Sequence, residues 1–287
     1  MKLDGKTILV TGSTDGVGRH VARTLGAAGA KVLIHGRDRQ RAERVAEEIR
    51  QAGAGSATFY PADLASLDDV RRLAAAIGRD HSRLDVLINN AGVGTASGGR
   101  ERRTSADGYE LRFAVNYLAG FLLARLLLPL IRASAPARIV NVASAGQQAI
   151  DFDDVMLTRS YSGARAYTQS KLSQIMFTID LAAELKGSGV GVNSLHPATY
   201  MNTTMVRDAG VSPVSTVEEG ADAILNLAVS PDLEGRTGLY FDRKRQSRAD
   251  PQAYDEAARA KLRALSFQWT RLGAAEPTSA SRGPPAS

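Results

Sequence analysis

Apolar residues along the chain fall into two alternating kinds of segment. Short runs rich in β-branched and aliphatic residues, typical of buried strands, are separated by segments long enough for an amphipathic helix, such as those from about residue 16 and over 39–51. Parallel strands need such long crossovers, because a tight turn joins only antiparallel neighbours. The pattern therefore predicts an α/β fold, a doubly wound Rossmann-type sheet of seven parallel strands with helices on both faces. The predicted strands are residues 7–11, 31–35, 57–61, 84–89, 138–143, 190–195 and 238–241.

One segment, residues 113–131, is apolar enough to resemble a membrane span. It carries Asn116, Arg125 and Pro129, and its length barely crosses a bilayer. We therefore expect a buried helix of a globular core and no membrane span.

The length of 287 residues suits one large domain. No internal repeat or linker divides residues 1–272, which we predict to be a single dinucleotide-binding catalytic domain. Residues 273–287 are rich in Pro, Ser and Ala and too poor in apolar surface to repay ordering, so we predict a disordered tail.

Composition excludes several classes of function. The 36 Lys and Arg residues against 30 Asp and Glu are spread along the chain, which gives little support to nucleic-acid binding. The absence of cysteine excludes disulfides, cysteine-ligated metals and a thiol nucleophile, and we expect no metal site. The first residues lack the features of a signal peptide, so we expect a cytoplasmic protein.

A glycine-rich turn follows the first predicted strand and precedes a helix. Glycines at such a turn let the backbone bend sharply, approach a pyrophosphate closely and direct helix N–H groups toward it. An ordinary loop is the alternative for a glycine-rich turn taken alone, but the strand-to-helix placement favours a dinucleotide site. The candidate residues are Gly12, Ser13, Thr14, Asp15, Gly16, Val17 and Gly18.

The glycine spacing also resembles a known family. Thr11-Gly12-(x3)-Gly16-x-Gly18 is similar to the cofactor motif of short-chain dehydrogenases/reductases rather than to Gly-x-Gly-x-x-Gly. Two further segments are similar to that family. The pair Asp63-Leu64 resembles the residues that contact the adenine ring, and the run Asn89-Asn90-Ala91-Gly92 resembles the motif beside the cofactor ribose. Both follow predicted strands, at the carboxyl ends where such sheets bind ligands.

The end of the second predicted strand indicates which cofactor is bound. An NAD site usually places a carboxylate there for the ribose 2′-hydroxyl. This chain has Gly36 at that point and Arg37 next to it, and a guanidinium group binds a 2′-phosphate well. We therefore predict NADP(H). The alternative is that Arg37 is a solvated cation at a helix start, partly neutralised by Asp38.

Two Tyr-x-x-x-Lys sequences occur, Tyr167 with Lys171 and Tyr240 with Lys244. The first lies in a helix-compatible segment, where residues four apart share a face. The second begins in a predicted strand, where alternation separates the pair. The first pair is therefore the catalytic candidate.

The chemistry needs such a pair, because a phenol with a pKa of about 10 is a poor acid-base catalyst at neutral pH. A nearby ammonium group and an oxidised nicotinamide favour the phenolate and lower that pKa. Tyr167 can then exchange a proton with a carbonyl oxygen while the cofactor exchanges hydride with the carbon. Ser144, after the fifth predicted strand, is placed to hydrogen-bond that oxygen.

The resemblance implies a fourth residue. In the family an asparagine of the preceding long helix anchors a water that links the lysine to solvent, and Asn116 matches it; a satisfied core amide is the alternative. The segment Tyr167 to Leu172 and the acidic run 150–154 are most similar to the retinol-dehydrogenase-like members. This resemblance implies a dehydrogenase or ketoreductase acting on a small, lipophilic alcohol, ketone or aldehyde.

The match is looser elsewhere. Residues 145–166 form a longer connection than in compact members, and we expect it to shape the substrate mouth. After the sixth strand Ala198 replaces the family's usual glycine, so the nicotinamide contacts carried onto Pro197 and Thr199 depend on a changed turn. We expect residues 198–215 to form a lid whose Tyr200 and Met201 favour an apolar ligand, ordinary packing being the alternative.

Two other functions remain as alternatives. A non-catalytic NADP(H) sensor would be expected to lack a catalytic residue, and none of the four is missing. A nucleotide-sugar epimerase or dehydratase would usually need a longer C-terminal substrate domain. In the resembling family the helices corresponding to 104–131 and 164–186 often pack against a second subunit, which implies a homodimer or homotetramer.

Overall fold

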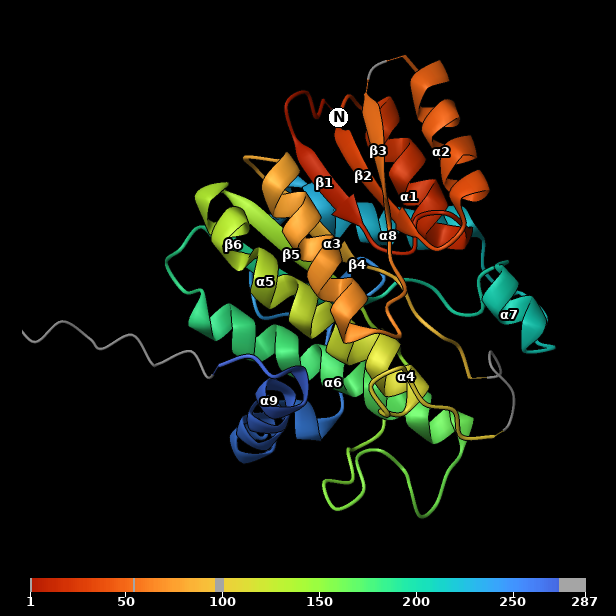
Figure 1. Cartoon of the computed structure of the whole chain (residues 1–287), viewed down its shortest axis with the longest axis vertical. Coiled ribbons are helices and arrows are strands. Elements are labelled where there is room, and N and C mark those ends of the chain that lie inside the picture. The colour runs from red at the N-terminus through yellow and green to blue at the C-terminus, as the bar shows by residue number, and fades with distance from the viewer. Residues whose placement is uncertain (1, 54, 96–100, 274–287) are drawn as a thin grey trace, which may run out of the picture.

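The computed structural model describes residues 2–53, 55–95 and 101–273. These residues form a single twisted sheet with helices around it (Figure 1). Its strand order is β3-β2-β1-β4-β5-β6-β7-β8. The strands are β1 (Thr7–Val10), β2 (Lys31–Gly36), β3 (Ser56–Pro61), β4 (Val86–Asn89), β5 (Ala137–Val142), β6 (Val190–His196), β7 (Tyr240–Asp242) and β8 (Arg245–Ser247).

The first seven strands pair in parallel, which confirms the predicted doubly wound sheet. β1 lies between β2 and β4, so the chain reverses its direction of winding there. Ligands of such sheets bind in the crevice outside the carboxyl ends of the strands at this switch point. The fold therefore places the glycine-rich turn, which follows β1, at the expected crevice.

The eighth strand corrects the predicted strand count. β8 pairs antiparallel with β7, with Tyr240 opposite Ser247 and Asp242 opposite Arg245. A tight turn joins the two strands, and Arg243 in it takes a φ of 55°. The sequence Arg245-Gln246-Ser247 is polar and lies at the solvent-facing edge, so it has no apolar run from which a strand could be predicted.

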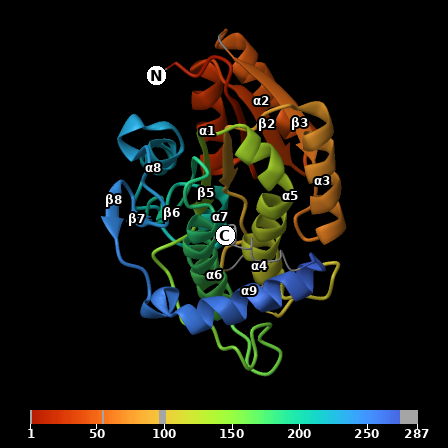
Figure 2. The same ribbon diagram turned by 90° about the vertical axis from the view of Figure 1, so that its left-hand side faces the viewer.

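Helices cover both faces of the sheet, each over its own apolar core (Figure 2). One face carries α1 (Gly16–Ala27), α2 (Arg39–Gln51) and α8 (Val217–Val229). The other face carries α3 (Leu67–Asp80), α5 (Ala119–Ala133) and α6 (Gly163–Glu184). Shorter elements are α7 (Thr204–Asp208) and the 3₁₀ turns Pro231–Leu233 and Pro251–Tyr254.

The long apolar helix begins later than the family resemblance implied. Residues 104 and 110 form an antiparallel bridge, and the helix runs from Leu111 through α4 (Leu111–Phe113), a π-helical turn (Ala114–Leu118) and α5. Its length and composition would allow it to cross a membrane, but 67% of its most apolar window is buried inside the fold. In this structure it is a core helix, packed against the sheet and α3.

The C-terminal helix α9 (Glu256–Thr270) crosses the outer side of this layer (Figure 2). The hydroxyl groups of Tyr117 and Ser266 are hydrogen-bonded at 2.7 Å, and the rings of Phe121 and Phe267 meet edge to face. Asp180 of α6 accepts hydrogen bonds from two arginines of α9. The chain's own helix therefore covers part of the outer surface of α5 and α6.

Candidate active site

The glycine-rich turn has a conformation and a packing that require glycine. Gly12 and Gly16 take φ angles of 64° and 52°, in the left-handed region. A β-carbon on Gly12 would lie 2.9 Å from the Ala91 Cα, and one on Gly18 would lie 2.2 Å from the Gly12 carbonyl oxygen. The start of α1 thus packs directly on the turn, as a pyrophosphate-binding turn requires.

Side chains from two neighbouring strands hold this turn. The Asn90 amide donates to the Thr11 carbonyl oxygen at 2.8 Å, and the Gly12 N–H donates to His35 Nδ1 at 3.0 Å. Burial lowers the pKa of His35 to about 4, so the ring is neutral at neutral pH and its Nδ1 can accept this bond. The role of His35 was not predicted, because nothing in the sequence around it distinguishes it from an ordinary strand residue.

A cavity of about 500 Å³ lies over the turn at the switch point, a size typical of ligand sites. Most residues predicted to bind a cofactor line it: Gly12, Thr14, Asp15, Gly16, Val17, Gly18, Arg37, Asp63, Leu64, Asn90, Ala91 and Gly92. Ser13 is an exception, because its buried hydroxyl faces inward and accepts from the His35 N–H. The cavity, and the turn that a β-carbon would obstruct, fit a dinucleotide.

The end of the cavity beside β2 carries two arginines, each paired with an aspartate. A β-carbon on Gly36 would lie 2.6 Å from the Thr14 side chain, so no carboxylate side chain fits there. Arg37 is 77% exposed, with Nη1 3.9 Å from a carboxylate oxygen of Asp63. Arg41, one helical turn later, also lines the cavity and pairs with Asp15 at 3.2 Å. Arg41 was not predicted, although its spacing from Arg37 could have indicated it.

Helix α6 brings the catalytic pair together. Lys171 lies one turn after Tyr167, and its Nζ is 5.6 Å from the centre of the tyrosine ring. The ammonium donates to the Val142 carbonyl oxygen at 2.9 Å and to Gln174 at 3.0 Å. The rival pair is separated, because Tyr240 is buried in β7 while Lys244 pairs with Asp222.

Burial dominates the protonation of this pair. It raises the pKa of Tyr167, opposed by a hydrogen bond to Ser144, and lowers the pKa of Lys171 to about 7. The sequence led us to expect a lowered phenol pKa from an ammonium group together with an oxidised nicotinamide. The protein itself shifts the phenol pKa upward instead, because desolvation raises it by more than the hydrogen bond to Ser144, which favours the phenolate, lowers it.

Asn116 joins the pair from the π-helical turn. Its Oδ1 accepts from the Val93 N–H at 2.7 Å, and its Nδ2 donates to Ser170 at 2.9 Å. A β-carbon on Gly92 would lie 3.3 Å from Asn116 Oδ1 and 3.6 Å from Lys171 Nζ. A single π-helical turn re-aims side chains in a helix and is frequent at functional sites. Asn116 and Lys171 therefore both lie next to the cavity-lining Gly92, whereas neither they nor Tyr167 line the cavity themselves.

The segment after β6 departs from the expected arrangement. Pro197 and Thr199 do not line the cavity, and the Thr199 hydroxyl is 3.0 Å from His196 Nε2. Ala198 avoids the left-handed region, which Tyr200 occupies instead with a φ of 43°. Farther along the segment predicted to be a lid, Thr203 lies against Gly16 of the glycine-rich turn. The proposed cofactor contacts of Pro197 and Thr199 remain predictions.

Acidic and histidine side chains do not gather into a metal site in the part of the chain that the structure describes. The polar residues that do gather are the phenol, ammonium, hydroxyl and amide described above. They can exchange a proton and stabilise a developing charge beside a dinucleotide cavity.

Comparison with known proteins gives consistent results. Residues 6–212 match the short chain dehydrogenase family. Human "Retinol dehydrogenase 13" is 38% identical, over 95% of this chain and 86% of its own length. A crystal structure of a putative uncharacterized protein from Mycobacterium paratuberculosis is 29% identical with a TM-score of 0.76, covering 94% of this chain and 95% of that one. The Pseudomonas aeruginosa RhlG/NADP active-site complex is 30% identical with a TM-score of 0.68, covering 84% and 95%.

Proposed function

The chain belongs to the short-chain dehydrogenase family, and we propose that it is an NADP(H)-dependent oxidoreductase that interconverts a carbonyl and an alcohol on a small, lipophilic molecule. One observation carries the proposal. Tyr167, Lys171, Ser144 and Asn116 come from three separate segments of the sequence and gather beside Gly92, which lines the dinucleotide cavity.

Each residue has a role that follows from its contacts. In the reductive direction NADPH, when bound in this cavity, would supply the hydride for the carbonyl carbon. The Tyr167 hydroxyl donates its proton to the carbonyl oxygen. Ser144 Oγ accepts a bond from the Gly146 N–H at 3.0 Å, so its own hydrogen, which is directed at Tyr167 in this structure, can be donated to the substrate oxygen when one lies between them. The Lys171 ammonium offsets the charge left on the phenol oxygen.

Support for NADP(H) comes from the two arginines at the β2 end of the cavity. Arg37 and Arg41 offer two guanidinium groups, and Gly36 excludes the carboxylate that would favour NAD. A structural relative is described as an NADP complex. We propose that both arginines bind the 2′-phosphate, Arg37 more freely because it is the more exposed.

Support for a lipophilic substrate comes from the lid. Met201 and Met205 line the cavity beside Thr203 and Thr204, so this segment brings two apolar side chains to the site. The name of the human relative refers to retinol, itself a lipophilic alcohol. We propose a substrate of that character, a ketone, an aldehyde or the corresponding alcohol.

The sensor alternative is not favoured. A protein that only binds the cofactor gains nothing from burying an ammonium group without a carboxylate partner, and Lys171 is such a group. The cytoplasmic location remains a proposal. The homodimer or homotetramer is also a proposal, and α9 already covers part of the surface of α5 and α6 through which it would form.

The test of the catalytic proposal is Tyr167→Phe. NADPH oxidation is followed with a panel of lipophilic ketones and aldehydes, and NADPH affinity by fluorescence titration. Loss of the proton donor should lower kcat about 10²- to 10⁴-fold. The dissociation constant for NADPH should stay within about twofold, a margin of about 0.4 kcal/mol. If the wild type bound NADPH but turned over no carbonyl, the non-catalytic NADP(H) sensor would become the better interpretation.

The test of cofactor choice is Arg37→Gln, with Arg50→Gln at the far end of α2 as the matched control. Loss of a charge-assisted bond to phosphate costs about 1.5–3 kcal/mol, so NADPH affinity should fall roughly 10- to 100-fold while NADH affinity is unchanged. The control should bind NADPH as the wild type does. Equal losses for NADPH and NADH would reject a 2′-phosphate role for Arg37.

A further inference from the structure

A buried ion pair lies beside the active site and has no part in the mechanism above. Arg112 and Glu110 stand at the start of the long apolar helix, with exposed side-chain fractions of 0% and 1%. Their nearest charged atoms are 3.6 Å apart. Removing two such charges from water is costly, and apolar residues of similar size usually stabilise a fold as well or better. The position of this pair therefore calls for a role other than stability.

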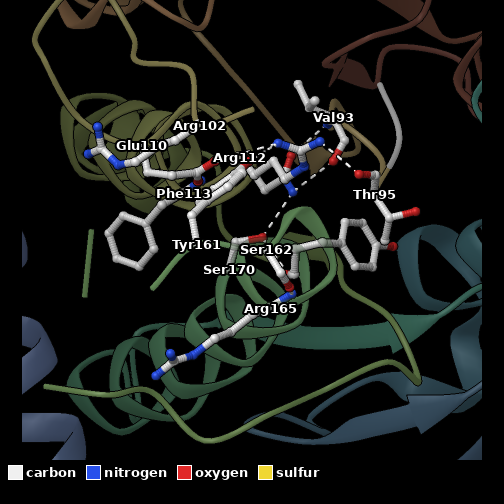
Figure 3. Close-up of polar contacts among 12 residues, drawn as sticks. Val93, Thr95, Arg102, Glu110, Arg112, Phe113, Tyr161, Ser162, Arg165 and Ser170 are labelled. Atoms are coloured by element: carbon white, nitrogen blue, oxygen red, sulfur yellow. Dashed lines mark hydrogen bonds and ion pairs between the residues drawn. The ribbon is translucent and has the colours of Figure 1, made fainter. Parts of the chain in front are cut away.

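The Arg112 guanidinium reaches two other segments of the chain (Figure 3). Its Nε donates to the Gly94 carbonyl oxygen at 2.9 Å, and its Nη2 donates to the Thr95 carbonyl oxygen at 2.7 Å. Its Nη1 donates to the Tyr161 hydroxyl oxygen at 2.5 Å. The Tyr161 hydroxyl in turn donates to Glu110 at 3.3 Å. A planar fork of donors can serve such separated acceptors together, which an ammonium group cannot.

These contacts continue into the catalytic residues. Asn116, four residues after Arg112, holds both the N–H and the carbonyl oxygen of Val93. The two side chains therefore fix residues 93–95, which directly follow the cofactor-lining Gly92, from both ends. Asn116 also donates to Ser170, whose hydroxyl donates to the Tyr167 carbonyl oxygen.

The start of α6 rests on the same arrangement. A β-carbon on Gly163 would lie 2.6 Å from the Thr95 carbonyl oxygen and 3.1 Å from Arg112 Nη2. Ser162, whose side chain accepts from the Arg165 N–H, caps the helix one residue after Tyr161. The first turn of α6, which leads to Tyr167, is thus packed against residues that Arg112 holds.

We propose that Arg112 is a positioning residue for the carbonyl substrate. With Glu110 balancing its charge, it holds residues 93–95 and the start of α6 as one rigid wall, so that the substrate carbonyl meets Ser144 and Tyr167. The proposal rests on the proposed oxidoreductase function. A misplacement of about 1 Å can cost about 10²-fold in rate, so loosening this wall should change catalysis more than cofactor binding.

The first test compares two tyrosine variants. Tyr161→Phe removes the hydroxyl that joins Arg112 to Glu110. Tyr109→Phe is the matched control, because its half-buried hydroxyl donates to the Trp269 carbonyl oxygen on α9, outside this arrangement. Tyr161→Phe should raise KM for the carbonyl and lower kcat/KM about tenfold, with the NADPH dissociation constant unchanged. Tyr109→Phe, which loses one hydrogen bond where Tyr161→Phe loses two, should change neither. Because Tyr161→Phe should melt at the lower temperature, both variants are assayed well below their melting transitions.

The second test is Arg112→Lys, which keeps the charge and loses the fork. The positioning role predicts a folded protein that binds NADPH normally and has kcat/KM reduced at least tenfold. A lysine variant with lower thermal stability but unchanged kcat/KM would reduce Arg112 to a structural residue. Should this variant fail to fold, the tyrosine comparison still decides.

The two proposals fail in different ways. If the wild type turns over no carbonyl with NADPH, the oxidoreductase function is overturned and this role with it. If the wild type is active and Tyr161→Phe has the same KM and kcat as Tyr109→Phe, the positioning role alone is overturned.

Discussion

The cofactor side and the catalytic side of the cleft are built from different materials. Around the glycine-rich turn the functional groups are mainly backbone atoms. Three positions there, Gly12, Gly18 and Gly36, must lack a side chain because a β-carbon would collide with neighbouring atoms. Around Tyr167 the functional groups are buried polar side chains, held by bonds between segments such as Asn116 to Val93. The first side is encoded locally along the chain, whereas the second depends on the assembled fold.

This difference explains what could be predicted from the sequence. The strand, the turn and the start of the helix lie within residues 7–18, so their pattern is visible in the chain itself. Tyr167 and Lys171 were found because a helix places residues four apart on one face. Arg112 could not be identified as a functional residue, because its partners at 94–95 and 161 come together only through the fold.

The fold was predicted to a similar extent and for a similar reason. Most of the seven parallel strands carry apolar runs that reflect burial in the sheet, whereas β3, at one edge, is largely exposed. β8 carries no such run, because it is a polar edge strand added by a tight turn after β7. The placement of α9 across α5 and α6 also left no local pattern, since its contacts are with residues such as Tyr117 and Asp180, far away in the sequence.

The largest expected effect tests the cofactor side of the cleft. Gly18→Ala would set a β-carbon 2.2 Å from the Gly12 carbonyl oxygen, so the turn must shift and NADPH affinity should fall more than about 100-fold. Gly78→Ala in α3 is the matched control, because a β-carbon there meets nothing within 4 Å and helix propensity favours alanine by about 0.5–1 kcal/mol. Fluorescence titration with NADPH and thermal melting measure both. Normal NADPH affinity in Gly18→Ala would contradict the proposed packing of the turn.

A smaller effect, a change in kcat/KM of about tenfold for each pH unit, tests the catalytic side of the cleft. The Lys171 pKa of about 7 means that its ammonium is present below that pH and lost above it, so kcat/KM for carbonyl reduction should fall as pH rises through about 7. Tyr167 remains protonated across this range because burial raises its pKa. Initial rates at saturating NADPH between pH 6 and pH 9, both limits being about one to two units from the Lys171 pKa, measure the effect.

Stability should move in the opposite direction, which separates this loss from unfolding. Between about pH 7 and the ordinary lysine pKa of 10.5, the unfolded chain binds a proton at Lys171 that the folded chain does not. The contribution of this residue to the free energy of unfolding therefore rises with pH in that window. If kcat/KM for reduction did not change with pH, or fell only where the melting temperature also fell, Lys171 would have no part in catalysis.

The smallest expected effect lies where the two sides meet, in the segment after β6. The family resemblance gives Thr199 a contact with the cofactor, whereas the structure turns its hydroxyl toward His196, whose pKa is lowered by burial and whose ring is therefore neutral. Thr199→Val should leave that ring nitrogen without its partner and cost about 1 kcal/mol in the free energy of unfolding. Thr24→Val, which removes a hydroxyl bonded to the His20 carbonyl oxygen within α1, is the control for loss of a threonine hydroxyl away from the cavity.

The dissociation constants for NADPH decide between the two assignments. If Thr199 acts only through His196, both threonine variants should stay within about twofold of the wild type, a margin of about 0.4 kcal/mol. A loss above about fivefold, confined to Thr199→Val, would mean that the segment rearranges to meet the cofactor. The cofactor side of the cleft would then extend past β6, and residues 198–200, where Tyr200 takes a φ of 43°, would belong to a part of the site that forms on binding.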